Sequence, residues 1–489
     1  MVGVARRGRR IIGIVLAGIV GGLAGAFVGF GPLTGDFAGL AAGAAVGAAV
    51  YGGLWWWALS APGRRAACWL LAALPVIFLV ALAGLALFQM IAIGAFDLPT
   101  ADRLDNFDRL WRALRDYYPY FELKGVDWED VYLRYRPLIE QAGDDDAYFN
   151  TIAAMLAELN DAHTMVSQPF LQPAAWFGEA EDIEGQVVIT GLSAEARAAG
   201  LERGDVVAAV NSQPVEQALA ALPPALRYGS TPANRRDFAL SNLLALWAPA
   251  ASLELTVRGA DGQARQATLR PASQPAEGEP PRPPVWGERL PSGVGYIEIA
   301  RFWQRSGEDL VALFDAALDG LMDTPGLVID LRRNGGGNSA LAARMAGRLL
   351  SEPFVYGREF YRQGLPFRLW RRWNDRRVDP RGATYTGPVA LLTDATSIST
   401  AEEFIISLVD SGRARTVGRP SGGGTGNPVV FKLPGGAVTF STGDLRQADG
   451  TPIEGRGVTP DVPVAWTLAD VRAGRDPDLE AAQQLLSIP

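Results

Sequence analysis

The sequence predicts a multidomain protein with N-terminal transmembrane helices, a small helical domain, a β domain and an α/β domain with a mainly parallel sheet. The chain has 489 residues, which is more than one hydrophobic core usually accommodates. Long apolar stretches occur near its start, and an apolar strand, helix and strand pattern occurs near its end. We expect a membrane segment at 1–95, a helical domain at 96–170, a β domain at 175–272, a proline-rich linker at 273–285 and the α/β domain at 286–489.

The membrane segment contains three apolar stretches without internal charge, at about 11–30, 37–59 and 66–90. Each is close to the roughly 20 residues that a helix needs to cross a bilayer. Arginines precede the first stretch and lie between the second and third, so both segments belong in the cytoplasm. Three crossings then place the rest of the chain on the periplasmic side of a bacterial-type inner membrane. A cleaved signal peptide is the alternative for the first stretch, and it leaves the same final orientation.

Composition restricts the possible functions. The formal net charge of -8 gives no general attraction to phosphate, which argues against a nucleic-acid partner. The single cysteine, Cys68, supports neither a disulfide framework nor a metal cluster. The chain has one histidine, His163, and two lysines, Lys124 and Lys432, so few side chains can act as a general base.

Helical and strand patterns alternate along the rest of the chain. Apolar residues from Phe107 to Tyr117 recur at three- and four-residue steps, and a second helical run ends near Leu159, before "LNDAHTMV". Short strand-like runs separated by glycine-bearing turns fill the predicted β domain. The stretch "ASQPAEGEPPRPP" is too rich in proline and polar residues to belong to a core, so it is interpreted as a linker.

The last segment shows the pattern of a βαβ unit. "GVGYIEIARF" and "PGLVIDLR" are apolar strand candidates that flank a helical run, and "GPVALLTD" is a third buried strand. A helix is expected from about Thr400 to Asp410. The polar stretch "TDATSISTAEEF" is therefore a strand-to-helix turn at the carboxyl edge of the sheet, where α/β proteins usually bind ligands.

Four separate pieces could form a site with a hydroxyl nucleophile, which needs a base, a group that orients the base and donors for an oxyanion. The turn offers Ser397 and Ser399, and "DLRRNGGGN" offers glycine amides that no side chain obstructs. His163 is the only imidazole, and Glu454 is a carboxylate in a turn-rich segment. Each also has a structural interpretation, since Ser399 can cap a helix and Glu454 can be a solvated surface charge.

These motifs together resemble a known family. "GLVIDLRRNGGGN", "PVALLTDATSISTAEEF", "GRARTVGRPSGGGTG" and "EGRGVTPD", in this order, resemble the C-terminal processing (tail-specific) protease family. "LNDAHT" is similar to its tricorn-core branch, and "AGLERGDVVAAVN" resembles a PDZ domain, a module that binds extended peptides at a sheet edge. The resemblance implies a ClpP/crotonase-like fold for the α/β domain.

The resemblance also implies roles for particular residues. The family's nucleophile falls on Ser399, and the tricorn-like branch uses a histidine and a glutamate, which match His163 and Glu454. The implied oxyanion donors are the amides of Gly337 and Thr400.

Two positions depart from the patterns of the family. The lysine of the bacterial Ser–Lys branch falls on Gly424, which disfavours that mechanism. Tricorn has a serine before its catalytic histidine, whereas this chain has Ala162. The connection from His163 to Glu454 must then be direct, through water or through another residue.

The expected protein is a membrane-tethered extracytoplasmic serine endopeptidase that forms an acyl-enzyme and needs no metal or organic cofactor. Its expected partners are the lipid bilayer and a protein or peptide substrate, whose C-terminus the PDZ domain could bind. The alternative is a non-catalytic membrane protein on the same fold that binds peptides or hydrophobic ligands.

Overall fold

The computed structural model describes residues 102–167, 173–246, 252–271, 282–362 and 370–487. The three predicted transmembrane stretches and most of the predicted linker lie outside these residues. Among the described helices, none is long and apolar enough to cross a membrane. The chain forms two compact units, and the larger one consists of Pro99–Gly357 and Asp375–Pro489. The smaller unit includes most of strands β13 (Phe354–Arg362) and β14 (Trp370–Val378).

Helices begin the larger unit, as the sequence predicts. They are α4 (Arg103–Tyr117), α5 (Phe121–Lys124), α6 (Trp128–Glu140) and α7 (Asp145–Ala157). The side chains of Asp102, Asp127 and Asp144 accept hydrogen bonds from first-turn amides of α4, α6 and α7, which stabilises these helix starts. The predicted apolar stripe of α4 is buried, with Phe107 fully covered and Tyr117 nearly so.

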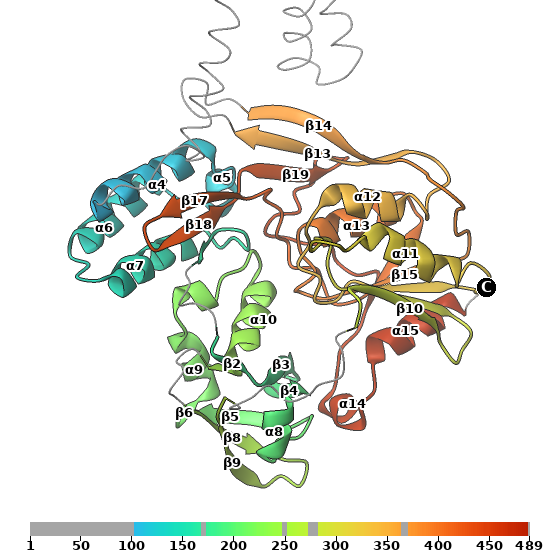
Figure 1. The fold of residues 1–489 in the computed structure, drawn as a ribbon, viewed down its shortest axis with the longest axis horizontal. Helices are drawn as coiled ribbons and strands as arrows, with labels where there is room; N and C mark the ends of the chain where they lie inside the picture. The colour runs from blue at the N-terminus through green and yellow to red at the C-terminus, as the bar shows by residue number, and fades with distance from the viewer. Residues whose placement is uncertain (1–101, 168–172, 247–251, 272–281, 363–369, 488–489) are drawn as a thin grey trace, which may run out of the picture. The chain divides into compact units, whose positions relative to one another are not determined.

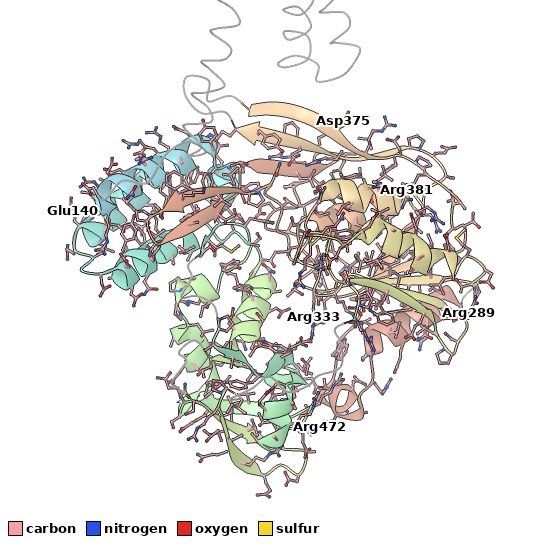
Figure 2. The ribbon with its side chains drawn as sticks, viewed as in Figure 1. Glu140, Arg289, Arg333, Asp375, Arg381 and Arg472 are labelled. Atoms are coloured by element: carbon pink, nitrogen blue, oxygen red, sulfur yellow. The ribbon has the colours of Figure 1, made fainter. Side chains whose placement is uncertain are left out.

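An antiparallel sheet with helices beside it follows in the region of the predicted β domain. The elements of this region are β2 (Ala175–Trp176), β3 (Gly178–Ile183), β4 (Gln186–Leu192), α8 (Ala194–Ala198), β5 (Val206–Val210), β6 (Gln213–Pro214), α9 (Val215–Ala221), η3 (Pro224–Leu226), α10 (Pro232–Leu243), β7 (Ala245–Leu246), β8 (Leu253–Arg258) and β9 (Ala264–Leu269). Strands β2 and β7 pair with each other as a separate two-stranded sheet. The strand order is β3-β4-β5-β8-β9, so β3 lies at an edge of this sheet, and α10 packs beside it (Figure 1). Arg472, labelled in Figure 2, donates to the carbonyl oxygens of Gly204 and Gly259 and so attaches this region to the C-terminal part.

The α/β region contains the predicted mainly parallel sheet. Its elements are β10 (Val285–Arg289), β11 (Gly295–Ile299), α11 (Leu310–Asp319), β12 (Leu327–Asp330), α12 (Ser339–Ala346), β15 (Val389–Thr393), α13 (Thr400–Val409), β16 (Ala414–Gly418), β20 (Val462–Pro463), α14 (Leu468–Ala473) and α15 (Pro477–Leu486). The order is β10-β11-β12-β15-β16-β20, with only β10 antiparallel to its neighbour. Leu391 packs into the core with α11, α12 and α13, while Ala390 and Leu392 belong to the core with α15, because successive strand residues face opposite sides.

A small third sheet connects distant parts of the chain. It consists of β1 (Met165–Ser167), β17 (Val429–Leu433) and β18 (Gly436–Phe440), in the order β1-β18-β17, and β19 (Gly443–Gln447) follows it in sequence. Met165 pairs with Thr439, so β17 and β18 lie beside the N-terminal helices (Figure 1). Since β1 begins two residues after His163 and β17 follows the loop 421–426, this pairing brings the histidine to that loop. The predicted domain boundaries themselves stay a prediction.

Candidate active site

Ser399 occupies the turn between β15 and α13 in an uncommon backbone conformation. Its φ is 62°, in the left-handed region that residues with a Cβ rarely adopt and that often occurs at functional sites. Its amide donates a hydrogen bond to the carbonyl oxygen of Gly424 over 2.7 Å. A Cβ added at Gly336 would lie 2.6 Å from the Cβ of Ser399, so only glycine permits this approach. The glycine run and the serine turn therefore meet, as the sequence predicts.

The two predicted oxyanion donors lie side by side. The Thr400 hydroxyl donates to the carbonyl oxygen of Gly337 over 2.9 Å. Thr400 is the first residue of α13, and amides of a first helical turn have no acceptor within the helix. Asn334 holds the glycine loop, because its side chain donates to the Ile299 carbonyl over 2.7 Å and accepts from the Gly336 amide over 2.9 Å. The hydrogen bond between Thr400 and Gly337 thus places the two residues that the resemblance assigns as oxyanion donors next to each other.

The imidazole of His163 is buried, with 9% of the residue exposed. Its backbone amide donates to Asp161 Oδ1 over 2.8 Å, which fixes the turn that carries it. Burial lowers the pKa of His163, and the Asp161 carboxylate opposes this shift. A neutral imidazole can accept a proton, as a general base must. Among the described residues, Nδ1 has no hydrogen-bond partner, and no hydrogen bond joins the imidazole to Ser399 or Glu454.

Glu454 is a buried carboxyl group, so its interpretation as a solvated surface charge is wrong. Its Oε1 lies 2.6 Å from Lys124 Nζ, and its Oε2 accepts a hydrogen bond from the Thr425 amide over 3.0 Å. Burial and the nearby Asp161 carboxylate raise the pKa of Glu454 to about 8. Lys124 and the Ser230 hydroxyl act in the opposite direction, lowering the pKa of Glu454 and favouring the carboxylate.

The loop 424–426 contacts all the residues of the predicted triad. The carbonyl oxygen of Gly424 accepts the hydrogen bond from the amide of Ser399, and the amide of Thr425 donates to Glu454. A Cβ added at Gly426, the third residue of the loop, would lie 3.4 Å from the Cβ of His163. Three pieces of the chain that are far apart in sequence thus meet at three consecutive loop residues.

Ser230 occupies the position between the histidine turn and Glu454. The amide of Ala162 donates to Ser230 Oγ over 3.0 Å, and this hydroxyl also lowers the pKa of Glu454. Ser230 precedes α10 and therefore comes from the region of the predicted β domain. It offers a hydroxyl where Ala162 lacks one, and no pattern in the sequence singles it out.

Glu402 is a second buried carboxyl group, directly beneath the Ser399 turn. Its Oε1 accepts from Ser421 Oγ over 2.6 Å and from the Gly423 amide over 2.8 Å. Its Oε2 accepts from the Gly424 amide over 2.9 Å and from the Ser399 amide over 3.2 Å. Burial raises the pKa of Glu402 to about 7, against these hydrogen bonds. A serine followed three residues later by glutamate is a capping-box spacing, which could have pointed to this contact.

Replacing Glu402 with glutamine is expected to lower kcat roughly 10- to 100-fold and to lower the melting temperature. Each carboxylate oxygen accepts from two donors, so an amide nitrogen in either orientation faces donors that it cannot satisfy. Steady-state kinetics on a peptide substrate and thermal unfolding measure both effects.

The neighbouring Glu403→Gln variant is the matched control for that change. Glu403 accepts from the hydroxyl groups of Ser339 and Tyr356, over 2.6 and 2.7 Å, and hydroxyl groups can also accept hydrogen bonds. The Glu403→Gln variant should therefore keep most of the kcat of the parent protein. Equal kcat values for the two variants would contradict the role given to Glu402.

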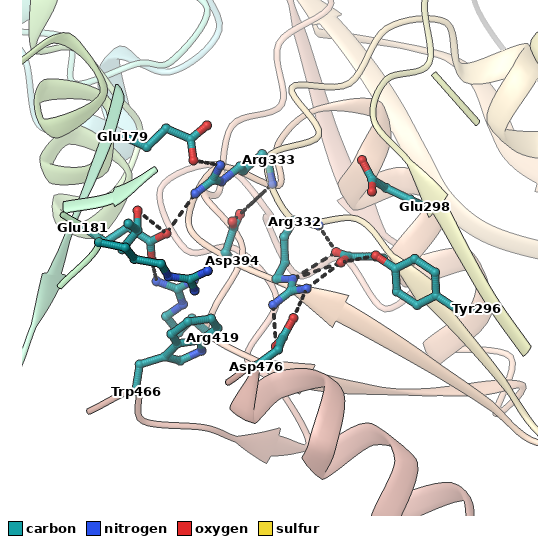
Figure 3. Close-up of a pocket in the computed structure, with 13 residues that line it drawn as sticks. Glu179, Glu181, Tyr296, Glu298, Arg332, Arg333, Asp394, Arg419, Trp466 and Asp476 are labelled. Carbon is teal, nitrogen blue, oxygen red and sulfur yellow. Dashed lines mark hydrogen bonds and ion pairs between the residues drawn. The ribbon is translucent and has the colours of Figure 1, made fainter. Parts of the chain in front are cut away.

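A charged pocket of about 320 Å³ lies next to the glycine loop (Figure 3). Arg333 forms ion pairs there with Glu179 and Glu181 of β3, and its amide donates to Asp394. Arg332 is held by several aspartates, including Asp330. None of the predicted triad residues lines this pocket. Its side chains hold the segment that leads into the glycine loop.

A serine at a strand-to-helix turn, next to glycine amides and near a buried imidazole and carboxyl group, is the arrangement of a serine hydrolase. Comparison with known proteins supports this class. Residues 293–464 match the sequence model of peptidase family S41, and residues 99–157 match that of the tricorn protease C1 domain. Residues 293–464 are thus identified as a region of the peptidase family S41 type, and that family consists of serine peptidases.

Curated relatives include tricorn protease homolog 1 of Streptomyces coelicolor, which is 25% identical over 427 residues, covering 78% of this chain and 35% of that protein. The carboxy-terminal-processing protease of Bartonella bacilliformis is 26% identical over 191 residues, covering 38% of this chain and 42% of that protein. The matched regions thus make up less than half of each of these relatives.

Solved structures share the fold. Mature CPAF, in complex with lactacystin, matches with a TM-score of 0.63 at 15% identity, covering 79% of this chain and 97% of that one. A protein of Parabacteroides merdae matches with a TM-score of 0.50 at 23% identity, covering 79% of this chain and 98% of that one.

Proposed function

We propose that the chain is a membrane-tethered, extracytoplasmic serine endopeptidase with Ser399, His163 and Glu454 as its catalytic residues. The observation that carries the proposal is their convergence on the loop 424–426. The match of residues 293–464 to peptidase family S41 favours hydrolysis of peptide bonds in proteins or peptides.

The chemistry follows from the position of each group. Ser399 attacks the carbonyl carbon of the peptide bond and passes its proton to His163, which then protonates the leaving amine. Glu454, as a carboxylate, stabilises the imidazolium that forms. Water then attacks the acyl-enzyme, with His163 again as the base, and releases the second product.

Two backbone amides would stabilise the oxyanion. Gly337 and Thr400 supply them, and the hydrogen bond between the Thr400 hydroxyl and the Gly337 carbonyl holds both in place. One such donor contributes about 3 kcal/mol to transition-state stabilisation in enzymes where it has been removed.

The membrane location and the peptide-binding role are further parts of the proposal. The apolar stretches and arginines of the first 95 residues support an inner-membrane anchor with the peptidase on the periplasmic side. The position of β3 at the edge of its sheet, beside α10, supports a PDZ domain that receives an extended peptide, such as a substrate C-terminus.

A fluorophosphonate probe on the folded full-length chain in detergent tests the proposal. The probe phosphonylates activated serines, and mass spectrometry of the digested protein then identifies the labelled residue. We expect labelling at Ser399, with loss of peptide cleavage in proportion to labelling. Absence of labelling and of cleavage in well-folded protein would contradict the proposal and favour a protein that binds peptides or hydrophobic ligands.

A further inference from the structure

Lys124 reaches the predicted active site from a distant part of the sequence. It is the last residue of α5 and lies 330 positions before its partner Glu454. Its Nζ lies 2.6 Å from Glu454 Oε1, and the side chains of the two residues are 8% and 0% exposed. Both charges are thus removed from water, and such a pair is strongly coupled because the interior screens it little.

The same ammonium group also binds the segment that carries the histidine. Lys124 Nζ donates to the carbonyl oxygen of Asn160 over 2.8 Å. Asn160 lies three residues before His163 and has a φ of 46°, at the tight turn that leads into "DAHT". One side chain therefore connects the carboxyl group and the histidine turn.

The other groups that face Glu454 determine what Lys124 contributes. Asp161 opposes ionisation of Glu454, while the Ser230 hydroxyl and the Thr425 amide favour the carboxylate. Tyr118 and Tyr120 are buried next to it, and their pKa values are raised by burial and by the carboxylates, so both stay neutral. Among the charged groups found to act on Glu454, Lys124 is the one that favours its charge.

We propose that Lys124 is a positioning residue of the peptidase site, which favours the carboxylate form of Glu454 and holds it against the histidine turn. This inference rests on the proposed function of Ser399, His163 and Glu454. The role differs from that of the lysine in a Ser–Lys peptidase, which takes the proton of the nucleophile. Here the ammonium group faces the carboxylate, and the imidazole remains the base.

The pH dependence of activity follows from this arrangement. Catalysis needs the Glu454 carboxylate, so kcat/KM should rise with pH through the pKa of Glu454, at about 8. The rise of kcat/KM with pH is the acid limb of the pH profile. Removing Lys124 removes a charge that favours the Glu454 carboxylate, so it must move this acid limb to higher pH. The folded pKa lies above the ordinary value of 4.5, so the contribution of Glu454 to stability is present at low pH and is lost as pH rises towards 8.

The experiment compares Lys124→Met, Lys124→Arg and Lys432→Met in the full-length chain. Lys432, the other lysine of the sequence, is exposed on β17 and is the matched control for loss of one positive charge. We expect Lys124→Met to shift the acid limb of kcat/KM upward by about one pH unit, which lowers activity at pH 7 roughly tenfold. Lys124→Arg should retain the parent profile, and Lys432→Met should not change it.

An active parent and a folded Lys124→Met protein with the same pH profile would overturn the inference and leave the proposed function intact. If Lys124→Met does not fold, Lys124→Arg decides, since a displaced acid limb in that variant would contradict a role based on charge. A parent that neither cleaves peptides nor labels at Ser399 would overturn the proposed function and this inference with it.

Discussion

Replacing Ser399 with alanine should lower kcat/KM by at least about 10⁴-fold, the scale seen when the nucleophile of a serine peptidase is removed. The substitution deletes the attacking oxygen but keeps the Cβ and the backbone amide that bonds to Gly424. Serine and alanine tolerate the positive φ equally poorly, so the fold should be unaffected. Peptide cleavage rates and thermal unfolding of the purified full-length variant measure the two expectations.

The control is Ser397→Ala, which tests the second serine of the turn. Ser397 Oγ donates to the Leu331 carbonyl over 2.8 Å and accepts from the Asp394 amide over 3.1 Å. Its removal leaves buried groups without a partner, so stability should fall by about 1 to 3 kcal/mol while the nucleophile remains. If Ser397→Ala abolished labelling and Ser399→Ala kept it, the assignment would be reversed.

The second large effect is expected for His163→Ala, a loss of at least about 10⁴-fold in kcat/KM. The chain contains no other imidazole, and the mechanism needs a neutral base whose pKa lies near the working pH. Burial lowers the pKa of His163, which keeps it in the base form. The rate of cleavage should be lower than that of the parent at every pH from 6 to 9.

A double variant tests whether the two residues act as one unit. Catalytic residues that depend on each other are not additive, so Ser399→Ala with His163→Ala should be about as inactive as either single variant. Added imidazole should restore part of the activity of His163→Ala and none of that of Ser399→Ala. Activity within tenfold of the parent in His163→Ala would mean that another group is the base.

The sequence predicted much of the fold because the patterns are local. The apolar run 389–393 and the helical run after Thr400 each have a clear periodicity, and the turn between them follows. The parallel pairing of β11, β12 and β15 was also predicted, since a strand, helix and strand unit of this spacing favours it. Glu403, for which the sequence offers no role, has a structural one: its carboxylate accepts hydrogen bonds from hydroxyl groups of α12 and β13.

The candidate site was predicted only in part. Ser399 and the glycine run can be recognised from the sequence because each follows the end of a buried strand, and the two strands end at the same edge of the sheet. Glu402 has a visible capping spacing, but nothing local shows that its carboxyl group also binds the amides of Gly423 and Gly424. Ser230 and Lys124 have no local signal at all.

The sequence by itself determined the strand-to-helix turn, the candidate nucleophile and the small number of side chains that can act as a general base. Hydrophobic periodicity and the residue preferences of turns act over a few residues, so these features can be recognised without knowledge of the fold. Only the tertiary structure decided which groups surround Glu454. The pairing of β1 with β18 and the burial of Lys124 join parts of the chain that are hundreds of residues apart, and only packing of the whole core selects such contacts.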